Sequence, residues 1–246
     1  MQKHYVIGDI HGEYQTLLAL IAKLPKNAKL IFVGDLIDRG SQSREVVAYI
    51  RKNGHQTVMG NHEVFMIKYG ERFAQHLLAD VNVDMNNTWI KNGGIKTLLS
   101  YGLLEKAEDS SYQIIKETEA IEQLQEDIEW MKKLPIYLEL DAKHSSDKKV
   151  VVSHSNISKV WTIRNDKEKR KELISETLWT RDKGISNEID IFNIYGHTPQ
   201  KHGAEITDDF VNIDTGCCFY SIKDKRYGRL SAYCVESGEV IEVGKV

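Results

Sequence analysis

Residues 34–40 read Gly-Asp-Leu-Ile-Asp-Arg-Gly and follow directly on the apolar run Leu-Ile-Phe-Val at residues 30–33. A short apolar run, rich in β-branched residues and ending at a glycine, predicts a buried strand that enters a tight loop. The loop carries two carboxylates and a guanidinium in close succession. Alone, such a loop is typical of many α/β proteins, in which its charges form a solvated ion pair. Its meaning here depends on two further segments of the same kind.

Those segments lie on either side of it at equal distances. Residues 8–12 read Gly-Asp-Ile-His-Gly after the run Tyr-Val-Ile, and residues 60–63 read Gly-Asn-His-Glu after Thr-Val-Met. Asp9 and Asp35 are 26 positions apart, and so are Asp35 and Asn61. This interval fits a strand, a helix and a second strand, the repeating unit of a parallel sheet. Such strands end at one edge of the sheet, so the oxygen and imidazole side chains gathered there predict a metal site.

The composition is that of a globular protein with one large domain. The chain has 246 residues, of which 41% are hydrophobic and 28% charged, so it can bury a substantial core. The net charge of −3 argues against the broad basic surface that binds a nucleic-acid backbone. Met1 leads straight into the first strand, without a basic segment or a long apolar stretch before it. We therefore expect no membrane segment and a cytoplasmic location.

The patterns along the chain predict a mixed α/β fold. Apolar residues at helical spacing predict helices over residues 13–24 and 43–51, between the first three strands. Short apolar runs in the last hundred residues predict strands at 136–140, 149–153, 190–195, 210–213, 229–235 and 239–243.

Residues 76–135 have a helical pattern of their own. Residues 105–129 are strongly acidic, and an apolar stripe recurs at Ile114, Ile121, Leu124, Ile128 and Met131. The plainer interpretation is a solvated helix face over a core stripe. We interpret residues 76–135 as a helical cap insertion within a single domain of residues 1–246, placed beside the metal edge, where it would select substrates.

Further segments in the second half complete a known pattern. The strand at 149–152 runs into Ser153-His154, and the strand at 190–195 runs into Gly-His-Thr-Pro at residues 196–199. Leu-Trp-Thr-Arg lies between them at 178–181, and Asn-Ile-Asp-Thr-Gly follows at 212–216. As an ordered set, these segments resemble the phosphoprotein phosphatase family of calcineurin-like metallophosphoesterases, of the bacterial and phage serine/threonine phosphatase type. Trp89, Gly93-Gly94 and residues 100–102 also resemble a stretch of bacterial family members.

The resemblance implies a calcineurin-like metallophosphoesterase fold of two packed mixed β-sheets flanked by helices. It also implies two divalent metal ions. One would be held by Asp9, His11 and Asp35, and the other by Asp35, Asn61, His154 and His197. Oxygen ligands mixed with imidazoles suit Mn²⁺, Fe or Zn²⁺ better than Ca²⁺, and we expect Mn²⁺.

The chain departs from the family pattern at two places. Ser155-Asn156 follows His154, where the family usually has a small residue and a glycine, so the ligand is intact but the neighbouring loop differs. Pro199 stands where the wider superfamily often has a second histidine. The phosphoprotein phosphatase branch shares this proline, so one metal should have fewer protein ligands and more water.

The same resemblance assigns catalytic roles. His62 would be the general acid that protonates the leaving alkoxide, an effect worth roughly 10²–10⁴-fold. Asp38 would accept a hydrogen bond from the other ring nitrogen of His62 and raise its pKa. Arg39 and Arg181 would bind the phosphoryl oxygens through their planar guanidinium groups. The match around Arg181 is shorter, and a structural ion pair is the alternative for that residue.

The expected function is hydrolysis of phosphoserine and phosphothreonine, with phosphotyrosine as a further substrate, by hydroxide that the metals generate. The partner would be a phosphoprotein or a small phosphoester. The alternative is a nucleotide hydrolase, such as a symmetrical diadenosine tetraphosphatase or an RNA 5′-end phosphatase. Those relatives tend to replace Asp38 and to end the third segment in Asp, so Asp38 and Glu63 favour a protein phosphatase. A metal-free interaction scaffold is disfavoured because all six ligand positions are filled.

The cysteines and the remaining histidines belong to no motif. Cys217, Cys218 and Cys234 do not suggest a disulfide framework. A cysteine-phosphatase loop would need an arginine six positions after Cys218, where Asp224 stands. We expect the cysteines to be small buried hydrophobic residues. We expect five histidines at the surface or at strand ends: His4, His55, His76, His144 and His202.

Overall fold

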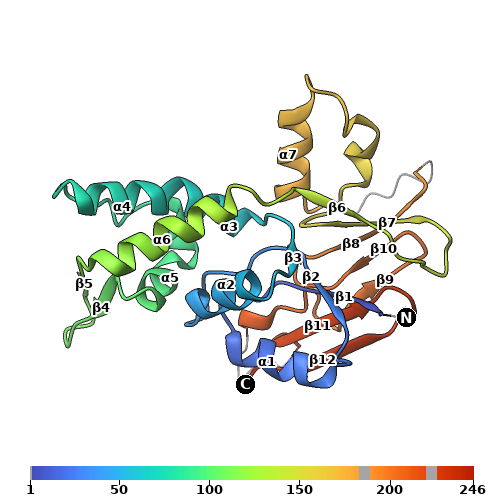
Figure 1. Cartoon of the computed structure of the whole chain (residues 1–246), viewed down its shortest axis with the longest axis horizontal. Coiled ribbons are helices and arrows are strands. Elements are labelled where there is room, and N and C mark those ends of the chain that lie inside the picture. Colours follow the sequence, from blue (N-terminus) through green and yellow to red (C-terminus); the bar gives the residue numbers. More distant parts are fainter. Residues whose placement is uncertain (1, 183–188, 220–225) are drawn as a thin grey trace.

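The computed structural model describes residues 2–182, 189–219 and 226–246. It contains two five-stranded sheets with helices outside them, and a further group of helices projects to one side (Figure 1). This confirms the mixed α/β class with two packed sheets. Within these described ranges, no helix is both long and apolar enough to cross a membrane.

The first sheet contains the three parallel strands that the equal spacing predicted. Its order is β12-β11-β1-β2-β3, in which the two strands from the end of the chain are antiparallel to their neighbours. The strands are β1 (His4–Ile7), β2 (Lys29–Phe32), β3 (Gln56–Thr57), β11 (Arg229–Cys234) and β12 (Val240–Gly244). Helices α1 (Tyr14–Lys23) and α2 (Ser43–Lys52) make the two crossovers. Asp9, Asp35 and Asn61 therefore follow the C-terminal ends of adjacent strands.

The second sheet is also mixed. Its order is β6-β7-β8-β10-β9, in which the three central strands are parallel and the two edge strands antiparallel. The strands are β6 (Tyr137–Leu140), β7 (Lys149–Ser153), β8 (Ile191–Tyr195), β9 (Glu205–Ile206) and β10 (Phe210–Asn212). His154 follows β7, and His197 follows β8. The second sheet thus brings two more imidazoles to the ends of parallel strands.

The sheets pack face to face through small β-branched side chains. Val6 and Ile31 of the first sheet belong to the same buried cluster as Val150 and Ile194 of the second, and all four are fully buried. Each such side chain stabilises the fold by roughly 1.5–3 kcal/mol relative to an exposed position. Helix α7 (Arg170–Trp179) follows β7 and packs on the second sheet through its own cluster. The packing of the two sheets holds the strand ends that carry the candidate ligands side by side.

The helical region at the side of the sheets begins before residue 76. Helix α3 (Asn61–Phe65) starts at a candidate ligand and continues through a π-helical turn into α4. The elements that follow β3 are α3, the π-helical turn Met66–Gly70, α4 (Glu71–Leu78), the turn Ile90–Gly94, α5 (Ile95–Ser100), β4 (Leu104–Lys106), β5 (Tyr112–Ile114) and α6 (Thr118–Met131). They lie together in Figure 1. We continue to interpret residues 76–135 as an insertion within one domain.

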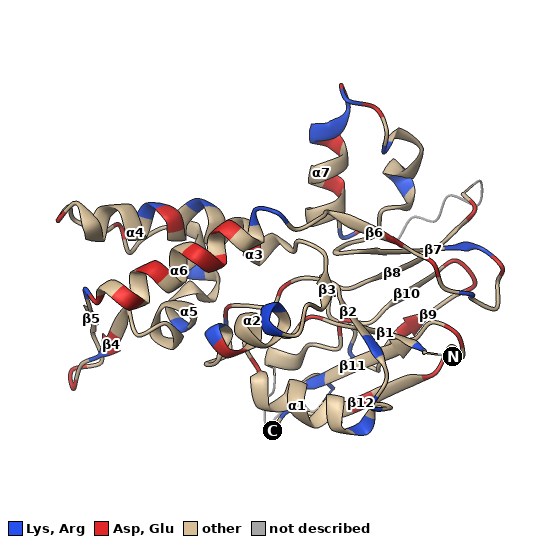
Figure 2. Cartoon of the chain, in the orientation of Figure 1, with Lys and Arg blue, Asp and Glu red and all other residues tan. Residues whose placement is uncertain are grey.

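The helical stripe expected in this segment is wrong at its start. Ile114 lies in β5 and is 40% exposed, whereas Ile121 and Leu124 of α6 are buried. The backbone N–H of Ser111 donates to the Asp109 carboxylate, and this turn closes the β4–β5 hairpin. A spacing of seven residues between Ile114 and Ile121 fitted a helix by coincidence. Figure 2 shows the acidic residues expected along α6.

A buried carboxylate joins the 76–135 segment to the first sheet. Asp127 of α6 is only 1% exposed; it pairs with Arg51 of α2 and accepts a hydrogen bond of 2.7 Å from the Tyr101 hydroxyl. Arg51 is partly exposed, but its removal would leave the buried Asp127 carboxylate without its cationic partner, which is destabilising. This cluster therefore fixes α6 and the end of α5 relative to α2.

One histidine expected at the surface is buried. The ring of His144 stacks on Phe192 with centroids 3.8 Å apart, and its Nε2 lies 2.9 Å from the Tyr233 hydroxyl oxygen. Its Nδ1 lies 2.7 Å from the Ser146 hydroxyl oxygen. Both ring nitrogens thus have a hydrogen-bond partner, which allows the ring to be buried in the loop before β7. The cysteines are free thiols, and Cys217 and Cys234 are buried as expected.

Candidate metal centre

The loops after β1 and β2 are joined by backbone hydrogen bonds. The carbonyl oxygen of Asp35 accepts from the N–H groups of Ile10 at 3.1 Å and His11 at 2.9 Å. In return, the carbonyl of His11 accepts from the N–H of Gly40 at 2.8 Å. These contacts bring the first two sequence segments into one rigid unit at the edge of the first sheet.

The Glu63 carboxylate joins the second loop to the third. It is fully buried and accepts from three backbone N–H groups: Asp35 at 2.8 Å, Leu36 at 2.9 Å and Gly60 at 2.8 Å. Burial and the neighbouring charge of Asp35 raise the pKa of Glu63 to about 7, and the three N–H donors oppose that rise. Glu63 thereby sets the backbone that presents Asp35 and Asn61.

Two glycines allow these loops to approach each other. A Cβ on Gly34, whose φ is +89°, would lie 2.5 Å from the backbone nitrogen of Gly60. A Cβ on Gly60 would lie 2.4 Å from the backbone nitrogen of Asp35. Any side chain at either position would push the second and third loops apart.

The backbone at the centre is strained. Left-handed φ values in residues other than glycine cost of order 1–3 kcal/mol each and cluster at functional sites. Eight such residues occur in the described part of the chain, and five of them belong to the predicted site: His11, Asp35, Asp38, Arg39 and His197. The hydrogen bonds to Glu63 and between the loops offset this strain.

Asp35 lies between two groups of imidazoles. Its Oδ1 is 3.4 Å from His154 Nε2, and its Oδ2 is 3.6 Å from His11 Nε2 and 3.9 Å from His62 Nε2. Burial alone would raise its pKa, but the electrostatic interactions of Asp35 with the imidazoles of His154, His62 and His11 outweigh burial and hold the pKa of Asp35 below its usual value. Each carboxylate oxygen thus faces a different group of nitrogen ligands, as a bridging ligand would.

One candidate ligand group is tightly convergent. Nε2 of His154, Nδ1 of His197 and Oδ1 of Asn61 lie 2.8–3.1 Å from one another. Burial lowers the pKa of His154, and it lowers the pKa of His197 to about 3. Both imidazoles are therefore neutral at physiological pH, as metal ligands must be.

These atoms suit a divalent ion. The Nδ1–H of His154 donates to the Val33 carbonyl at 2.8 Å, so its Nε2 offers a lone pair to the site, where the Asn61 and Asp35 oxygens are also acceptors. Adjacent ligands of an octahedral ion with bonds of about 2.1 Å lie about 3.0 Å apart. A cation would relieve the repulsion among acceptors that converge at this spacing.

The other candidate ligand group lies at Oδ2 of Asp35. His11, Asp35 and His62 each place one ligand atom within 4.8 Å of the others. The group does not include Asp9, whose carboxylate accepts from the backbone N–H of His197 at 3.1–3.2 Å. Burial, with the charges of Asp214 and Asp35, raises the pKa of Asp9 well above its usual value. Asp9 therefore adds a buried carboxylate beside the pair of ligand groups, and its ligand role stays a prediction.

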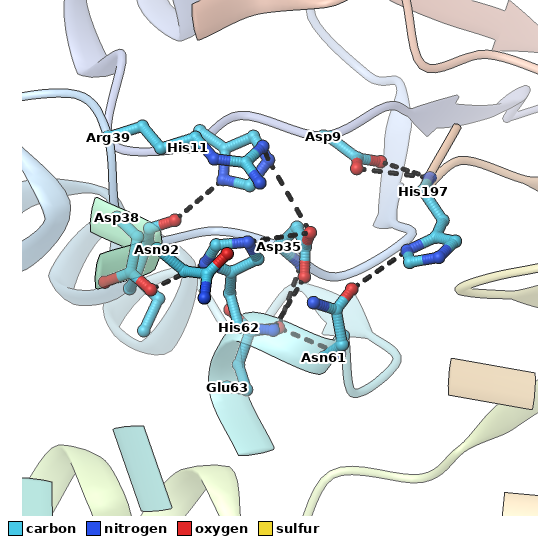
Figure 3. A network of polar contacts seen from close by, with 12 residues as sticks. Asp9, His11, Asp35, Asp38, Arg39, Asn61, His62, Glu63, Asn92 and His197 are labelled. Carbon is cyan, nitrogen blue, oxygen red and sulfur yellow. Dashed lines mark hydrogen bonds and ion pairs between the residues drawn. The ribbon is translucent and has the colours of Figure 1, made fainter. Parts of the chain in front are cut away.

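His62 and Asp38 form a buried dyad. His62 Nδ1 lies 2.6 Å from Asp38 Oδ2, and neither residue is more than 1% exposed (Figure 3). Burial lowers the pKa of His62, but the charges of Asp35 and Asp38 and the hydrogen bond to Asp38 outweigh it, so the pKa is raised. With Nδ1 occupied, Nε2 is the nitrogen that faces Asp35 and the ligand groups.

The two arginines differ in their setting. Arg39 Nη1 lies 2.7 Å from His11 Nε2 and 3.9 Å from Cys218 Sγ. The half-buried Cys218 is thus a neighbour of the centre rather than a core residue. Arg181 is exposed just after α7, where its charge contributes to lowering the pKa of His154. Contacts of both arginines with a phosphoryl group stay predictions. Arg39 contacts His11 in this structure.

Several residues of the centre were given no role by the sequence. Asp214 is 3% exposed, and burial raises its pKa to about 7. Its segment was recognised, but one sequence does not show that its charge acts on Asp9. Trp89 and Thr97 donate hydrogen bonds to Asp38, and only the resemblance of the stretch around Trp89 pointed to them.

Comparisons with known proteins agree with this geometry. The family model described as calcineurin-like phosphoesterase matches residues 3–214. Serine/threonine-protein phosphatase 1 of Salmonella typhimurium is 27% identical over 226 residues, which is 87% of each chain. The asymmetrical bis(5′-nucleosyl)-tetraphosphatase PrpE of a Geobacillus strain is 26% identical over 241 residues, covering 87% of this chain and 85% of the relative. A solved structure of a candidate diadenosine tetraphosphatase superposes with a TM-score of 0.58 at 19% identity, covering 100% of this chain and 94% of the other.

If Asp35 is shared by two ions, substitutions should separate the sites. We expect the wild-type protein to bind two Mn²⁺ ions, and His154→Ala and His11→Ala to lose one each. Asp35→Asn should weaken the binding of both ions by about tenfold or more, because it removes the negative ligand charge that the two ions would share. Equilibrium dialysis with elemental analysis measures this, with His202→Ala as the surface control. One site of unchanged affinity in Asp35→Asn would show that the carboxylate is not shared.

Proposed function

The chain belongs to the calcineurin-like phosphoesterase family, and we propose that it hydrolyses phosphoserine and phosphothreonine esters, with phosphotyrosine as a further substrate. The observation that carries this proposal is the buried His62–Asp38 dyad beside Asp35, with a nitrogen-to-oxygen distance of 2.6 Å. Such a dyad can deliver a proton to a leaving alkoxide, which is the requirement of a phosphomonoester with a poor leaving group. Phosphoester hydrolysis follows from the family, and the choice of phosphoamino acids is ours.

We propose two divalent ions, with Mn²⁺ first and Fe or Zn²⁺ as alternatives. Asp9, His11 and Asp35 would hold one ion. Asp35, Asn61, His154 and His197 would hold the other. When bound, such ions lower the pKa of water and neutralise charge on the phosphoryl oxygens.

His62 supplies the proton in this proposal. Asp38 holds Nδ1, so the proton that is transferred comes from Nε2, which points towards Asp35 Oδ2 at 3.9 Å. The charge of Asp35 and the hydrogen bond to Asp38 outweigh burial and raise the pKa of His62, which favours retention of that proton. A leaving-group oxygen within reach of Nε2 would depart as a neutral hydroxyl rather than as an alkoxide.

Arg39 and Arg181 would bind the remaining phosphoryl oxygens. A guanidinium presents two parallel N–H donors, which match two oxygens of a phosphate. Arg39 already lies at the centre, with its guanidinium carbon 5.1 Å from the Phe219 ring centroid. We expect it to exchange its contact with His11 for a phosphoryl group when substrate and metals are bound. The cytoplasmic location expected from the sequence also stays a prediction.

A second candidate function is hydrolysis of bis(5′-nucleosyl) tetraphosphates, which the name of one relative specifies. A specific feature of this chain favours it. The ring of Phe65 lies 5.8 Å from that of His62 and 5.3 Å from that of Trp179, which is 41% exposed. The half-buried Phe65 and the exposed Trp179 next to the proposed general acid offer an aromatic surface on which a nucleobase can stack.

The effect of replacing His62 on activity should depend on the leaving group of the substrate. His62→Asn should lower kcat/KM for a phosphoserine peptide by about 10²–10⁴-fold. The loss for p-nitrophenyl phosphate should be less than about tenfold, because nitrophenolate leaves without a proton. Steady-state kinetics with matched metal content measures this, and His202→Asn serves as the control. Equal losses on both substrates, or lost metal, would give His62 another role.

A substrate comparison decides between the two functions. We expect kcat/KM for phosphoserine and phosphothreonine peptides to exceed that for diadenosine tetraphosphate by at least about tenfold, or roughly 1.4 kcal/mol. The assay contains Mn²⁺, and includes a phosphotyrosine peptide and 5′-triphosphate RNA. If diadenosine tetraphosphate is the better substrate, its products identify the symmetrical or asymmetrical reaction, and the protein phosphatase proposal is wrong.

A further inference from the structure

The carboxylate of Asp38 is held by two residues of the 76–135 segment. Trp89 Nε1 donates to its Oδ1 at 3.0 Å and to its Oδ2 at 3.1 Å, and the Thr97 hydroxyl donates to Oδ1 at 2.5 Å. Asp38, Trp89 and Thr97 are all fully buried. Oδ1 thus has two donors from this segment, while Oδ2 is the oxygen that meets His62 Nδ1.

Thr97 also holds the backbone of Asp38. The N–H of Asp38 donates to the hydroxyl oxygens of Thr97 and Ser43, each at 3.0 Å, and those two hydroxyls lie 3.0 Å apart. Asp38 has a φ of +72°, a conformation that needs support from its surroundings. Thr97 therefore contacts both the backbone N–H and the side-chain carboxylate of Asp38.

The glycine pair after Trp89 makes this approach possible. Gly93 has a φ of +113°, and its carbonyl accepts from the N–H of Arg39 at 3.4 Å. A Cβ on Gly93 would lie 2.7 Å from the Arg39 nitrogen, and one on Gly94 would lie 2.7 Å from the Trp89 ring. Neither position accepts a side chain without moving Arg39 or Trp89. The sequence motif Trp89…Gly93-Gly94 is thus a device for bringing one turn against the Asp38-Arg39 backbone.

We propose that Trp89 and Thr97 are positioning residues that set the orientation of the Asp38 carboxylate, and through it the orientation of the general acid His62. The proposal rests on the proposed function in one respect, namely that His62 protonates the leaving group. A carboxylate without donors at Oδ1 would lose stabilisation in a buried site and could rotate to share both oxygens with His62. Proton transfer requires alignment within hydrogen-bond distance, so a misaligned ring lowers the chemical rate without weakening substrate binding.

The 76–135 segment is itself held firmly enough to act in this way. The Asp127–Arg51–Tyr101 cluster joins α6 and the end of α5 to α2, and Trp89 packs in the same apolar cluster as Leu98 and Leu124. The segment therefore contributes to catalysis through Asp38, whether or not it also contacts a substrate.

The test uses substitutions that remove single donors. Trp89→Phe removes the indole N–H, and Thr97→Val removes the hydroxyl at nearly constant volume. We expect each to lower kcat for a phosphoserine peptide by about tenfold or more, with KM within about twofold and the loss for p-nitrophenyl phosphate below about threefold. Metal content should be unchanged. Thr97→Ser should restore most of the activity, because it returns the donor. Trp161→Phe and Thr16→Val, buried residues of the same types away from the centre, are the matched controls.

The outcomes separate this inference from the proposed function. If His62→Asn shows no dependence on the leaving group, the general-acid assignment fails, and with it the premise. Suppose that His62→Asn shows that dependence. If Trp89→Phe and Thr97→Val then lower kcat equally for both substrates, or for neither, the positioning role is wrong. Should Trp89→Phe fail to fold by circular dichroism, the pair Thr97→Val and Thr97→Ser decides alone, and a serine variant no better than the valine variant contradicts the inference.

Discussion

The three hydrogen bonds that the Glu63 carboxylate accepts from backbone N–H groups are the constraint on which the centre depends. They join the loop after β2 to the start of α3, and they hold Asp35 in a left-handed conformation that its own steric preferences oppose. A neutral side chain at this position could accept fewer of these bonds in a fully buried site. Because Gly34 and Gly60 meet at this same point, the second and third loops have no room to adjust independently.

Asp35 can act as the shared ligand only because of that arrangement. Its two oxygens face separate groups of imidazoles, and two further carboxylates, Asp9 and Asp214, are buried nearby. Neutral histidines and converging acceptors leave this region in need of positive charge, which divalent ions with oxygen and nitrogen preference would provide. In the proposed function, Arg39 and Arg181 would add positive charge for a bound phosphoryl group. The centre thus combines a rigid backbone with converging acceptor atoms that bound cations would stabilise.

Much of the fold and of the candidate site was predictable because it depends on local sequence patterns. The 26-residue intervals determined which strands are parallel neighbours, so the meeting of Asp9, Asp35 and Asn61 at one sheet edge followed. The family resemblance added His154 and His197 from the second sheet, and the structure brings both to Asn61. What sequence reasoning missed depends on single side-chain contacts between distant positions. Glu63 acts on backbone groups, Trp89 and Thr97 reach Asp38 across 51 and 59 positions, and no periodicity encodes such contacts. The β4–β5 hairpin was missed because the spacing of Ile114 also fits a helix, and buried His144 because nothing near it in sequence shows Phe192 or Tyr233.

We propose that two metal ions share the carboxylate of Asp35, whose backbone N–H donates to Glu63. Electron paramagnetic resonance of the protein reconstituted with two equivalents of Mn²⁺ measures this link directly, because ions that share a carboxylate are magnetically coupled. We expect the spectrum of a spin-coupled manganese pair, and we expect Glu63→Gln to replace it by the spectrum of isolated ions. A wild-type spectrum that is the sum of two independent Mn²⁺ ions would show that Asp35 is not a shared ligand.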